Sequence, residues 1–447
     1  MLRKILIVGA GKSTSYLIDY LLEKSEEEKL QVTIGDLTLK TIAPSVKNHP
    51  AVTLLKLDVV KQQARKNAIT NADLVISMLP ANLHGIVAKD CLFYGKHLIT
   101  ASYVSNEILS LDQEVKAKGL VFMNEIGLDP GIDHMCALQV LDKIRNKGGK
   151  IVLFESFTGG LIAPESDTNL WHYKFTWNPR NVVVAGQGGT AQFIQEGAYK
   201  YIPYHTLFSR TEPIDIKGYG SFEAYANRDS LKYRKAYGLE DAKTLYRGTI
   251  RKKGFSKAWN IFVQLGMTDD SFTIKNSQGM SYREFVNQFL AYSAADSVEM
   301  KFRHYLKSSQ EDSIWKKFLE LDIFSKSKTI KTKNATPAQI LQEILEASWS
   351  LSKEDKDMVV MCHKFGYELA GKKHQLNAQL VVLGENHTHT AMAKTVGLPV
   401  AIAALLVLNK KITTPGVQIP IQKEVYRPIL KELQAHGIVF KEEWISN

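Results

Sequence analysis

The 447-residue sequence contains only three cysteines, and no two of them are close together. Cys91, Cys136 and Cys362 form neither a disulfide framework nor the short spacing of a zinc site. Such sparse, isolated cysteines are typical of a reducing compartment. We therefore expect a cytoplasmic protein without a bound metal.

The sequence also lacks a long hydrophobic run. The longest one near the C-terminus, PVAIAALLVL at 399–408, is shorter than the roughly 20 residues that span a bilayer. The N-terminal MLRKILIVGAG lacks the separate apolar core and cleavage site of a signal peptide. We expect a soluble protein with no membrane partner.

Acidic residues are fewer than basic ones, with 46 Asp and Glu against 57 Lys and Arg, which leaves a net charge of +11. The lysines gather in loop-like segments such as KSKTIKTK at 326–333. No basic stripe is interleaved with aromatics, as a groove for nucleic acid would require. We expect a solvated, lysine-rich surface and no nucleic-acid partner.

Glycines follow the first apolar run directly. Residues 4–8 are continuously apolar, as in a strand buried on both faces of a parallel sheet, and apolar residues then recur at helical spacing over 16–21. A strand, a glycine turn and a helix in this order suit a dinucleotide pyrophosphate, although the third glycine of the pattern is missing. The residues expected at the phosphates are Gly9, Gly11, Lys12, Ser13 and Thr14.

An acidic residue ends the second predicted strand, QVTIGD at 31–36. Asp36 stands where an acid accepts hydrogen bonds from the adenosine ribose, and it would repel a 2′-phosphate. This position favours NAD over NADP. The alternative is an aspartate that only stabilises a turn.

Further strands are predicted at 52–59, 72–80 and 97–100, with helices at 83–94 and 104–118. This alternation predicts a Rossmann-type, doubly wound α/β domain over 1–130. Ligands bind beyond the carboxyl ends of such strands. The further cofactor contacts expected there are Asp58, Ser77, Met78, Pro80 and Ala101.

The rest of the chain changes character. Residues 131–280 and 351–389 predict an α+β domain with a largely antiparallel sheet, including a hairpin of 357–369 with 374–384. Residues 281–350 form a predicted helical insert without chemistry. There Thr336, Pro337 and Gln339 signal a helix start with a capping box.

Two further segments have a predicted structure. The apolar segment 390–412 predicts a buried helix, entered through a Gly-Leu-Pro bend, that returns with 390–447 to complete the nucleotide domain. GGTAQF at 188–193 is a glycine pair before a possible helix, and we interpret it as a loop.

The stretch MNEIGLDPGIDHM, at 123–135, combines glycines, a proline and two aspartates where the chain leaves the first domain. Clefts between domains are preferred ligand sites. Asp129 could hold a substrate amine or relay a proton, and His134 could do the same. Asp133 could hold a substrate amine or relay a proton as well, but the favoured interpretation is that it is the N-cap of the helix that follows.

Arginines in the second domain could bind carboxylates. Arg228 in YANRDS and the pair Arg247 and Arg251 in RGTIR offer the planar fork that matches a carboxylate. The alternative for Arg228 is a surface salt bridge. His387 and His389 have no third ligand at a recognisable spacing, so we expect no metal there.

Several long motifs resemble one family, saccharopine dehydrogenase (L-glutamate-forming). NEIGLDPGIDHM, ADLVISMLP, TASYVS, GGLIAPESDTNLWHYKFTW, NRDS, LYRGTIRKKGF, DMVVMCHKFG and AMAKTVGLP are all similar to its segments, in the same order. The resemblance implies a nucleotide domain, an α+β substrate and dimerisation domain with a helical insert, and a homodimer. It implies an enzyme of lysine metabolism that reduces the imine of L-glutamate and aminoadipate semialdehyde to saccharopine with NAD(P)H, or the reverse.

The resemblance also implies roles for residues. Asp129 and Tyr103 become the candidates for catalysis, and Leu128 and Trp177 would lie beside the cofactor. The expected substrate contacts are Ser102, Tyr103, Asp129, Asn227, Arg228 and Arg251. The sequence departs from the family pattern at Thr158, where a cysteine is usual, at Ile162 and in YANRDS and NHTHTA.

Two other functions fit parts of these motifs. A carboxy(nor)spermidine dehydrogenase would join aspartate semialdehyde to a polyamine, and its pocket should carry acids in place of Arg228 and Arg251. A non-catalytic nucleotide-binding protein on the same fold would have an empty or blocked substrate cleft.

Overall fold

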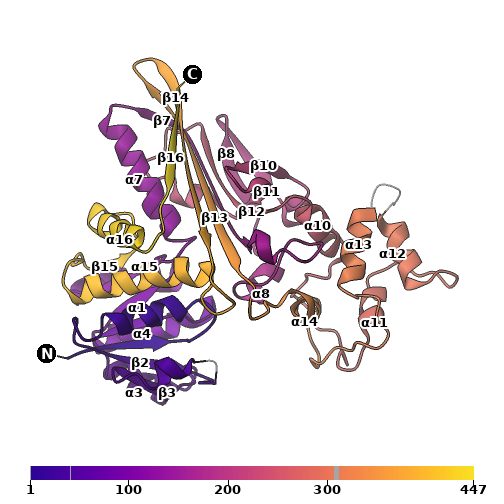
Figure 1. Ribbon diagram of the computed structural model, residues 1–447, viewed down its shortest axis with the longest axis horizontal. Coiled ribbons are helices and arrows are strands. Elements are labelled where there is room, and N and C mark those ends of the chain that lie inside the picture. The colour runs from indigo at the N-terminus through magenta and orange to yellow at the C-terminus, as the bar shows by residue number, and fades with distance from the viewer. Residues whose placement is uncertain (1, 41, 307–311, 447) are drawn as a thin grey trace. The chain divides into compact units, whose positions relative to one another are not determined.

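The computed structural model describes residues 2–40, 42–306 and 312–446, and its chain forms two compact units (Figure 1). One unit comprises residues 1–151 and 365–447, and the other comprises 152–364. The units group 131–151 and 365–389, which were predicted to belong to the second domain, with the nucleotide-binding part. The predicted division into a nucleotide-binding domain, a substrate domain and a helical insert therefore stays a prediction.

The first unit is built on a seven-stranded sheet in which every pairing is parallel. Its strands are β1 (Arg3–Val8), β2 (Leu30–Asp36), β3 (Val52–Lys56), β4 (Leu74–Ser77), β5 (His97–Thr100), β6 (Val121–Met123) and β15 (Gly416–Gln418). Their order is β15-β6-β5-β4-β1-β2-β3. The predicted doubly wound domain is confirmed, and its strand order reverses between β1 and β4, where such folds bind ligands.

Within its described residues, the first unit also contains ten helical segments, and several of them pack on this sheet. They are α1 (Ser15–Glu23), α2 (Pro44–Lys47), α3 (Gln62–Thr70), η1 (Ala81–Leu83), α4 (His84–Tyr94), α5 (Asn106–Leu109), α6 (Asp112–Ala117), α7 (Ile132–Asn146), α15 (Ala391–Leu408) and α16 (Lys423–Ala435). Side chains of β1, β4 and β5 form a core with those of α3 and α4 on one side. The predicted helix 104–118 is split into α5 and α6.

The late helix α15 does return to the nucleotide domain, where it lies alongside α1 (Figure 1). It begins at Ala391 and continues through Pro399, so the predicted bend before the helix was wrong. Gly397 allows the close approach, because a Cβ there would lie 2.8 Å from the Leu17 nitrogen. Within the described residues, α15 is the helix long and apolar enough to cross a membrane, but 78% of it is buried in the protein. That burial is typical of a core helix.

Two more strands belong to the first unit, β14 (Lys372–Leu383) and β16 (Lys441–Ser446), which pair antiparallel. β13 (Asp357–Leu369) precedes β14 and is its hydrogen-bonded neighbour. The predicted hairpin is therefore confirmed.

The second unit contains a mixed sheet. Its further elements are β7 (Lys150–Ile162), η2 (Pro164–Ser166), α8 (Pro179–Val183), β8 (Ala191–Gln195), β9 (Ala198–Ile202), α9 (Tyr204–Leu207), β10 (Thr211–Ile216), β11 (Gly220–Ala226), η3 (Leu231–Tyr233), β12 (Thr244–Lys252) and α10 (Phe255–Leu265). The order is β10-β11-β12-β7-β13, with β8 on β12. β12 and β7 are parallel, so the sheet is less uniformly antiparallel than predicted. The possible helix after the glycine pair at 188–189 is instead β8.

The helical insert contains α11 (Tyr282–Asn287), α12 (Val298–Leu306), α13 (Asp312–Glu320) and α14 (Pro337–Trp349). Residues 307–311 of the predicted insert lie outside the described residues. Thr336 caps α14 as predicted: its hydroxyl accepts from the Gln339 N–H at 3.2 Å, and the Gln339 side chain accepts from the Thr336 N–H at 2.8 Å.

Replacing this cap should destabilise the insert. We expect Thr336→Ala to lower the free energy of unfolding by about 1 kcal/mol, because the Gln339 N–H loses its acceptor and the Asp270 carboxylate loses the Thr336 hydroxyl as a donor. Chemical denaturation followed by circular dichroism would measure the change. Thr413→Ala, in an exposed loop, is the control and should leave the midpoint unchanged. Equal midpoints for the two variants would contradict the assigned role of the cap.

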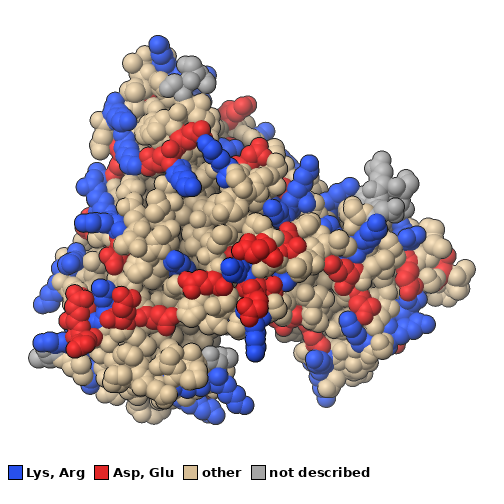
Figure 2. Space-filling view, viewed as in Figure 1, with Lys and Arg blue, Asp and Glu red and all other residues tan. Residues whose placement is uncertain are grey.

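The surface charge is mixed. On the face shown in Figure 2, Lys and Arg side chains are interspersed with Asp and Glu side chains. The surplus of positive charge is therefore spread over that face and does not form one stripe.

Candidate active site

The glycine turn lies at the point where the strand order reverses. Gly9 has a φ of +96°, and a Cβ there would lie 2.8 Å from the Met78 carbonyl oxygen, so the turn requires glycine. A Cβ on Gly11 would meet nothing within 4 Å. Thr14 is buried and donates its hydroxyl to the Gly11 carbonyl at 2.7 Å. This hydrogen bond stabilises the turn at the position where the dinucleotide pattern would have its third glycine.

These features fit a dinucleotide. Open space next to Gly11 and the start of the nine-residue α1 provide a cradle for a pyrophosphate. Lys12 is exposed and Ser13 partly exposed on the same turn. The predicted phosphate-binding residues are therefore brought together.

Asp36 bonds to the glycine turn itself. One carboxylate oxygen accepts from the Ala10 N–H at 2.7 Å, and the other accepts from the Thr38 N–H at 2.9 Å. The second bond is that of a turn aspartate, which was the alternative interpretation. The first bond places the carboxylate beside the phosphate-binding turn, where a ribose would lie.

A buried histidine connects the ends of β4 and β5. His84, the first residue of α4, has Nδ1 at 2.8 Å from the Ser77 hydroxyl. Its Nε2 lies 2.8 Å from the Ser102 hydroxyl and 3.5 Å from that of Thr100. Burial lowers the pKa of His84 to about 4. The sequence interpretation missed this residue, because a lone histidine in ANLHGI forms no motif.

The GLDPG turn is compact. A Cβ on Gly131, whose φ is +146°, would lie 2.1 Å from the Gly127 oxygen, so no larger residue fits. The Gly127 N–H donates to the Pro130 carbonyl at 2.9 Å, and the Asp129–Pro130 peptide is cis. The Tyr103 hydroxyl, which is partly exposed, donates to Asp129 Oδ1 at 2.9 Å. The two candidates for catalysis are thus direct partners.

Asp133 is not the N-cap that was predicted. α7 begins at Ile132 with Gly131 as its N-cap, and Asp133 lies in the first turn. Its carboxylate still holds the helix start, because Oδ1 accepts from the Gly131 N–H at 2.6 Å. The tight conformation of Gly131 shifts the helix start toward the N-terminus.

His134 is fully buried beside a glutamate that the sequence interpretation missed. Its Nε2 lies 2.9 Å from Glu125 Oε2, while Glu125 Oε1 accepts from the Val104 N–H at 3.0 Å. Glu125 therefore ties the segment after Tyr103 to the start of the Asp129 turn. Its φ of +56° marks a constrained backbone.

The second unit places Arg251 in an aromatic surround. Its guanidinium carbon lies 5.1 Å from the Tyr173 ring centroid, 5.5 Å from Phe255 and 5.7 Å from Tyr225. Nη1 donates to the Ile250 carbonyl at 2.9 Å, but Nε has no partner among the described residues. An unpaired, buried donor is costly, so this arginine fits an anionic ligand.

The acid opposite Arg251 forms no ion pair with it among the described residues. Glu223 lies opposite it across the β11–β12 ladder. The Glu223 carboxylate instead accepts from the Gly254 N–H at 2.9 Å and the Ser256 N–H at 2.7 Å, at the start of α10. The Glu223 carboxylate therefore binds the start of α10 and not the Arg251 guanidinium.

Other residues share the Arg251 face of the sheet. Arg247, Thr249 and Arg251 alternate along β12, so their side chains point to one face. Thr249 donates its hydroxyl to Asn227 Oδ1 at 2.6 Å, and Thr158 pairs with Thr249 in the ladder of β7. The Thr158 hydroxyl is buried without a partner among the described residues.

Arg228 and Arg247 have different environments. Arg228 is exposed, and its backbone carbonyl accepts from the Gln192 N–H at 2.7 Å. Arg247 is buried, with its guanidinium 4.6 Å from the Tyr233 ring centroid. Of the predicted arginines, Arg247 and Arg251 are therefore buried and Arg228 is exposed, and Arg251 is the one that lies among three aromatic rings.

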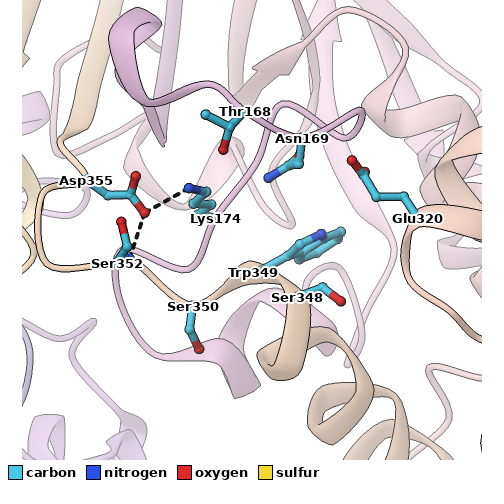
Figure 3. Close-up of a pocket in the computed structure, with 9 residues that line it drawn as sticks. All are labelled: Thr168, Asn169, Lys174, Glu320, Ser348, Trp349, Ser350, Ser352 and Asp355. Atoms are coloured by element: carbon cyan, nitrogen blue, oxygen red, sulfur yellow. Dashed lines mark hydrogen bonds and ion pairs between the residues drawn. The ribbon is translucent and has the colours of Figure 1, made fainter.

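A cavity of about 330 Å³ in the second unit lies where the helical insert meets the segment before Tyr173 (Figure 3). On its wall the Lys174 ammonium contacts Asp355 at 2.8 Å, and both side chains are largely buried. Trp349 at the end of α14 packs on Tyr173. The lining contains none of the predicted site residues. We therefore assign this region a supporting role, in which Trp349 holds the Tyr173 ring that lies against Arg251.

The other predicted residues are placed as follows. Asp58 follows β3 and accepts from the Val60 N–H at 3.1 Å. Met78 continues β4 by donating to the Val8 carbonyl, and Pro80 precedes η1. Ala101 approaches Gly127 closely, Leu128 is buried, and Trp177 is partly exposed.

The two histidines of NHTHT lie in the first unit. His389 Nε2 contacts Asp19 at 2.8 Å. Within the described ranges, no group of three or more His, Cys, Asp or Glu side chains could hold a metal.

Two family models match the chain. The model described as the saccharopine dehydrogenase NADP binding domain matches residues 5–123, and the saccharopine dehydrogenase C-terminal domain matches 127–438.

Known relatives agree with these models. Saccharopine dehydrogenase [NADP(+), L-glutamate-forming] of Saccharomyces cerevisiae is 32% identical over 99% of this chain and 100% of its own length. The mitochondrial alpha-aminoadipic semialdehyde synthase of Bos taurus is 32% identical over 98% of this chain, which spans 47% of that relative. The apo structure of the Saccharomyces cerevisiae saccharopine dehydrogenase (L-Glu forming) matches with a TM-score of 0.87 at 31% identity, covering 99% of this chain and 100% of that one.

Proposed function

Because the chain belongs to the saccharopine dehydrogenase family, we propose that it condenses L-glutamate with L-2-aminoadipate 6-semialdehyde and reduces the imine to saccharopine, or catalyses the reverse. It is an oxidoreductase that acts on a CH–NH bond with NAD(P). Its place is lysine metabolism, to which the substrates of its relatives belong.

The observation that carries this proposal is the environment of Arg251. A buried guanidinium whose Nε has no partner among the described residues supports an anionic substrate, and both glutamate and saccharopine carry carboxylates. A polyamine would bring a second positive charge against it. This argues against a carboxy(nor)spermidine dehydrogenase. Asn227 and Arg228 complete the proposed carboxylate contacts.

The proposed chemistry needs positioning more than covalent catalysis. The bound cofactor supplies or accepts the hydride. Asp129 and Tyr103 hold the substrate nitrogen through their hydrogen-bonded pair, and this pair can exchange a proton with that nitrogen. Ser102 binds the substrate beside them. The glycine turn, Met78 and Ala101 orient the cofactor against this group.

A coupled assay tests the function. Absorbance of the reduced cofactor should fall when the semialdehyde and glutamate are both present, and stay constant with either alone. Aspartate semialdehyde with a diamine should give no turnover. Turnover with that second pair but not with the first would contradict the proposal, as would no turnover by folded, cofactor-binding protein.

We further propose that NAD is preferred over NADP, although the name of the Saccharomyces cerevisiae relative specifies NADP(+). Asp36 is the support, since its carboxylate lies beside the glycine turn and would repel a 2′-phosphate. We expect wild type to have a higher kcat/KM for NADH, and Asp36→Ser to shift the ratio toward NADPH by about tenfold or more.

The control for this change is Glu27→Gln, which removes an exposed acid of the same unit. It should leave the ratio unchanged. A wild-type preference for NADPH would show that Asp36 does not select the cofactor.

A homodimer in the cytoplasm is also part of the proposal. Dimerisation rests on the resemblance to the family. The cytoplasmic location rests on cysteine usage, since Cys91, Cys136 and Cys362 are all buried and lie far apart in the sequence.

A further inference from the structure

His84 meets three hydroxyl groups at once because of the register of the parallel sheet. Ser77 and Thr100 are partners in the β4–β5 ladder, so their side chains leave neighbouring strand ends on the same face. Ser102 follows two residues after Thr100, and its backbone N–H donates to the Thr100 hydroxyl at 3.3 Å. The imidazole therefore connects a predicted cofactor contact, Ser77, to a predicted substrate contact, Ser102.

The imidazole is neutral at physiological pH, because burial holds its pKa near 4. A neutral imidazole has one N–H donor and one acceptor nitrogen. Nε2 faces two hydroxyl oxygens, whereas Nδ1 faces one. A ring N–H can be shared between two acceptors, which assigns the proton to Nε2. Nδ1 then accepts from the Ser77 hydroxyl.

This assignment determines what Ser102 can bind. When its oxygen accepts from Nε2–H, its own O–H is directed away from the ring. Ser102 is partly exposed and precedes Tyr103, the partner of Asp129, so the O–H is available to a ligand. We propose that His84 is a positioning residue that fixes the Ser102 hydroxyl as a hydrogen-bond donor to a carboxylate of the amino-acid substrate. The inference rests on the function proposed above.

The opposite tautomer would have the opposite effect. With the proton on Nδ1, Nε2 would accept from Ser102, and the serine oxygen would offer only lone pairs to a ligand. Such a serine would favour an ammonium group. A proton on Nε2 therefore supports selection for an acidic substrate, in addition to the arginines of the second unit.

Four variants of the full chain test this role: His84→Leu, His84→Gln, Ser102→Ala, and His84→Leu combined with Ser102→Ala. At saturating reduced cofactor, His84→Leu should raise KM for glutamate by about tenfold or more, because a hydrogen bond to a charged group is weakened. It should change kcat by less than about threefold. His84→Gln should restore most of the KM, since its amide N–H can replace Nε2–H.

The double variant separates positioning from general damage. If His84 acts through Ser102, the double variant should have the same KM as Ser102→Ala alone. Thermal melts should show each variant folded. If His84→Leu does not fold, Ser77→Ala takes its place. It should raise KM by a smaller factor and also show no further effect in combination with Ser102→Ala.

The matched control is His97→Gln. His97 is partly buried in the same sheet, its Nδ1 accepts from the Val121 N–H at 3.0 Å, and burial lowers its pKa too. Its replacement should leave KM for glutamate unchanged. Equal KM changes for the His97 and His84 variants would indicate a general effect of losing a buried imidazole and would overturn the inference.

The outcomes separate the inference from the function. In one case the wild type turns over glutamate and the semialdehyde, but the KM changes of the two single variants multiply in the double variant, or His84→Gln does not restore KM. That result would overturn the role of His84 and leave the proposed function standing. No wild-type turnover with glutamate and the semialdehyde, despite reduced-cofactor binding by fluorescence, would overturn the proposed function and this inference together.

Discussion

Replacing Asp129 by Asn is expected to lower kcat by about 10²–10⁴-fold while leaving the binding of reduced cofactor unchanged. The Asp129 carboxylate accepts from the Tyr103 hydroxyl at 2.9 Å and can take a proton or hold a cationic nitrogen. An amide of the same shape can do neither. Steady-state kinetics gives kcat, and cofactor fluorescence gives the binding constant.

The partner variant makes this test specific. Tyr103→Phe should also lower kcat, and the two changes together should cost less than the product of the single effects, because the residues act as one unit. Asp19→Asn, at an exposed acid of α1 that contacts His389, is the control and should retain activity. Full activity of folded Asp129→Asn would remove this pair from the mechanism.

Replacing Arg251 by Lys is expected to raise KM for glutamate and for saccharopine by about 10- to 100-fold. The charge is kept, but the planar fork and its stacking on Tyr173 and Phe255 are lost. The cation that remains should preserve folding, which a thermal melt would verify. An unchanged KM in a folded variant would show that Arg251 does not bind substrate.

Two variants calibrate the Arg251 result. Arg180→Lys alters a partly buried arginine that pairs with Asp270 in the same unit, and it should leave KM unchanged. Arg228→Ala removes an exposed side chain and should raise KM less than Arg251→Lys does. No effect at Arg228 would leave Arg251 and Asn227 as the carboxylate contacts.

The nucleotide-binding unit was largely predictable, because its signals are local. Buried parallel strands are continuous apolar runs, and a glycine turn followed directly by a helix has few other uses. The capping box at Thr336 was predictable for the same reason, since its four positions are adjacent in the chain. The contact of α15 with α1 was expected only by analogy, but Gly397 provides its physical basis.

Contacts between distant residues were not predictable from patterns. The link from Ser77 through His84 to Ser102 depends on strand register, and Glu125 bonds to Val104, from which α5, α6 and β6 separate it in the chain. Neither forms a spacing motif. The parallel pairing of β12 with β7 was not predicted, because the sequence of a strand does not show which strands will be its neighbours in the sheet.

Asp133 shows the limit even of local rules. An aspartate before an apolar helical run suggests an N-cap, but the close approach of Gly131 to Gly127 starts α7 earlier. The carboxylate still binds an N–H at the helix start, so the chemistry was predicted correctly and the position was not. In contrast, Asp129 was distinguished from Asp133 by position and resemblance, and it is the one that bonds to Tyr103.

The most direct test of the proposed function is to identify the amino acid released from saccharopine. Its secondary amine joins two carbon chains, so oxidation on one side releases glutamate and the semialdehyde, and oxidation on the other side releases lysine and 2-oxoglutarate. With saccharopine and oxidised cofactor, we predict one glutamate released for each reduced cofactor formed, measured by chromatography and absorbance in the same sample. Reduced cofactor accompanied by lysine, or no reduction by folded enzyme, would contradict the assigned reaction.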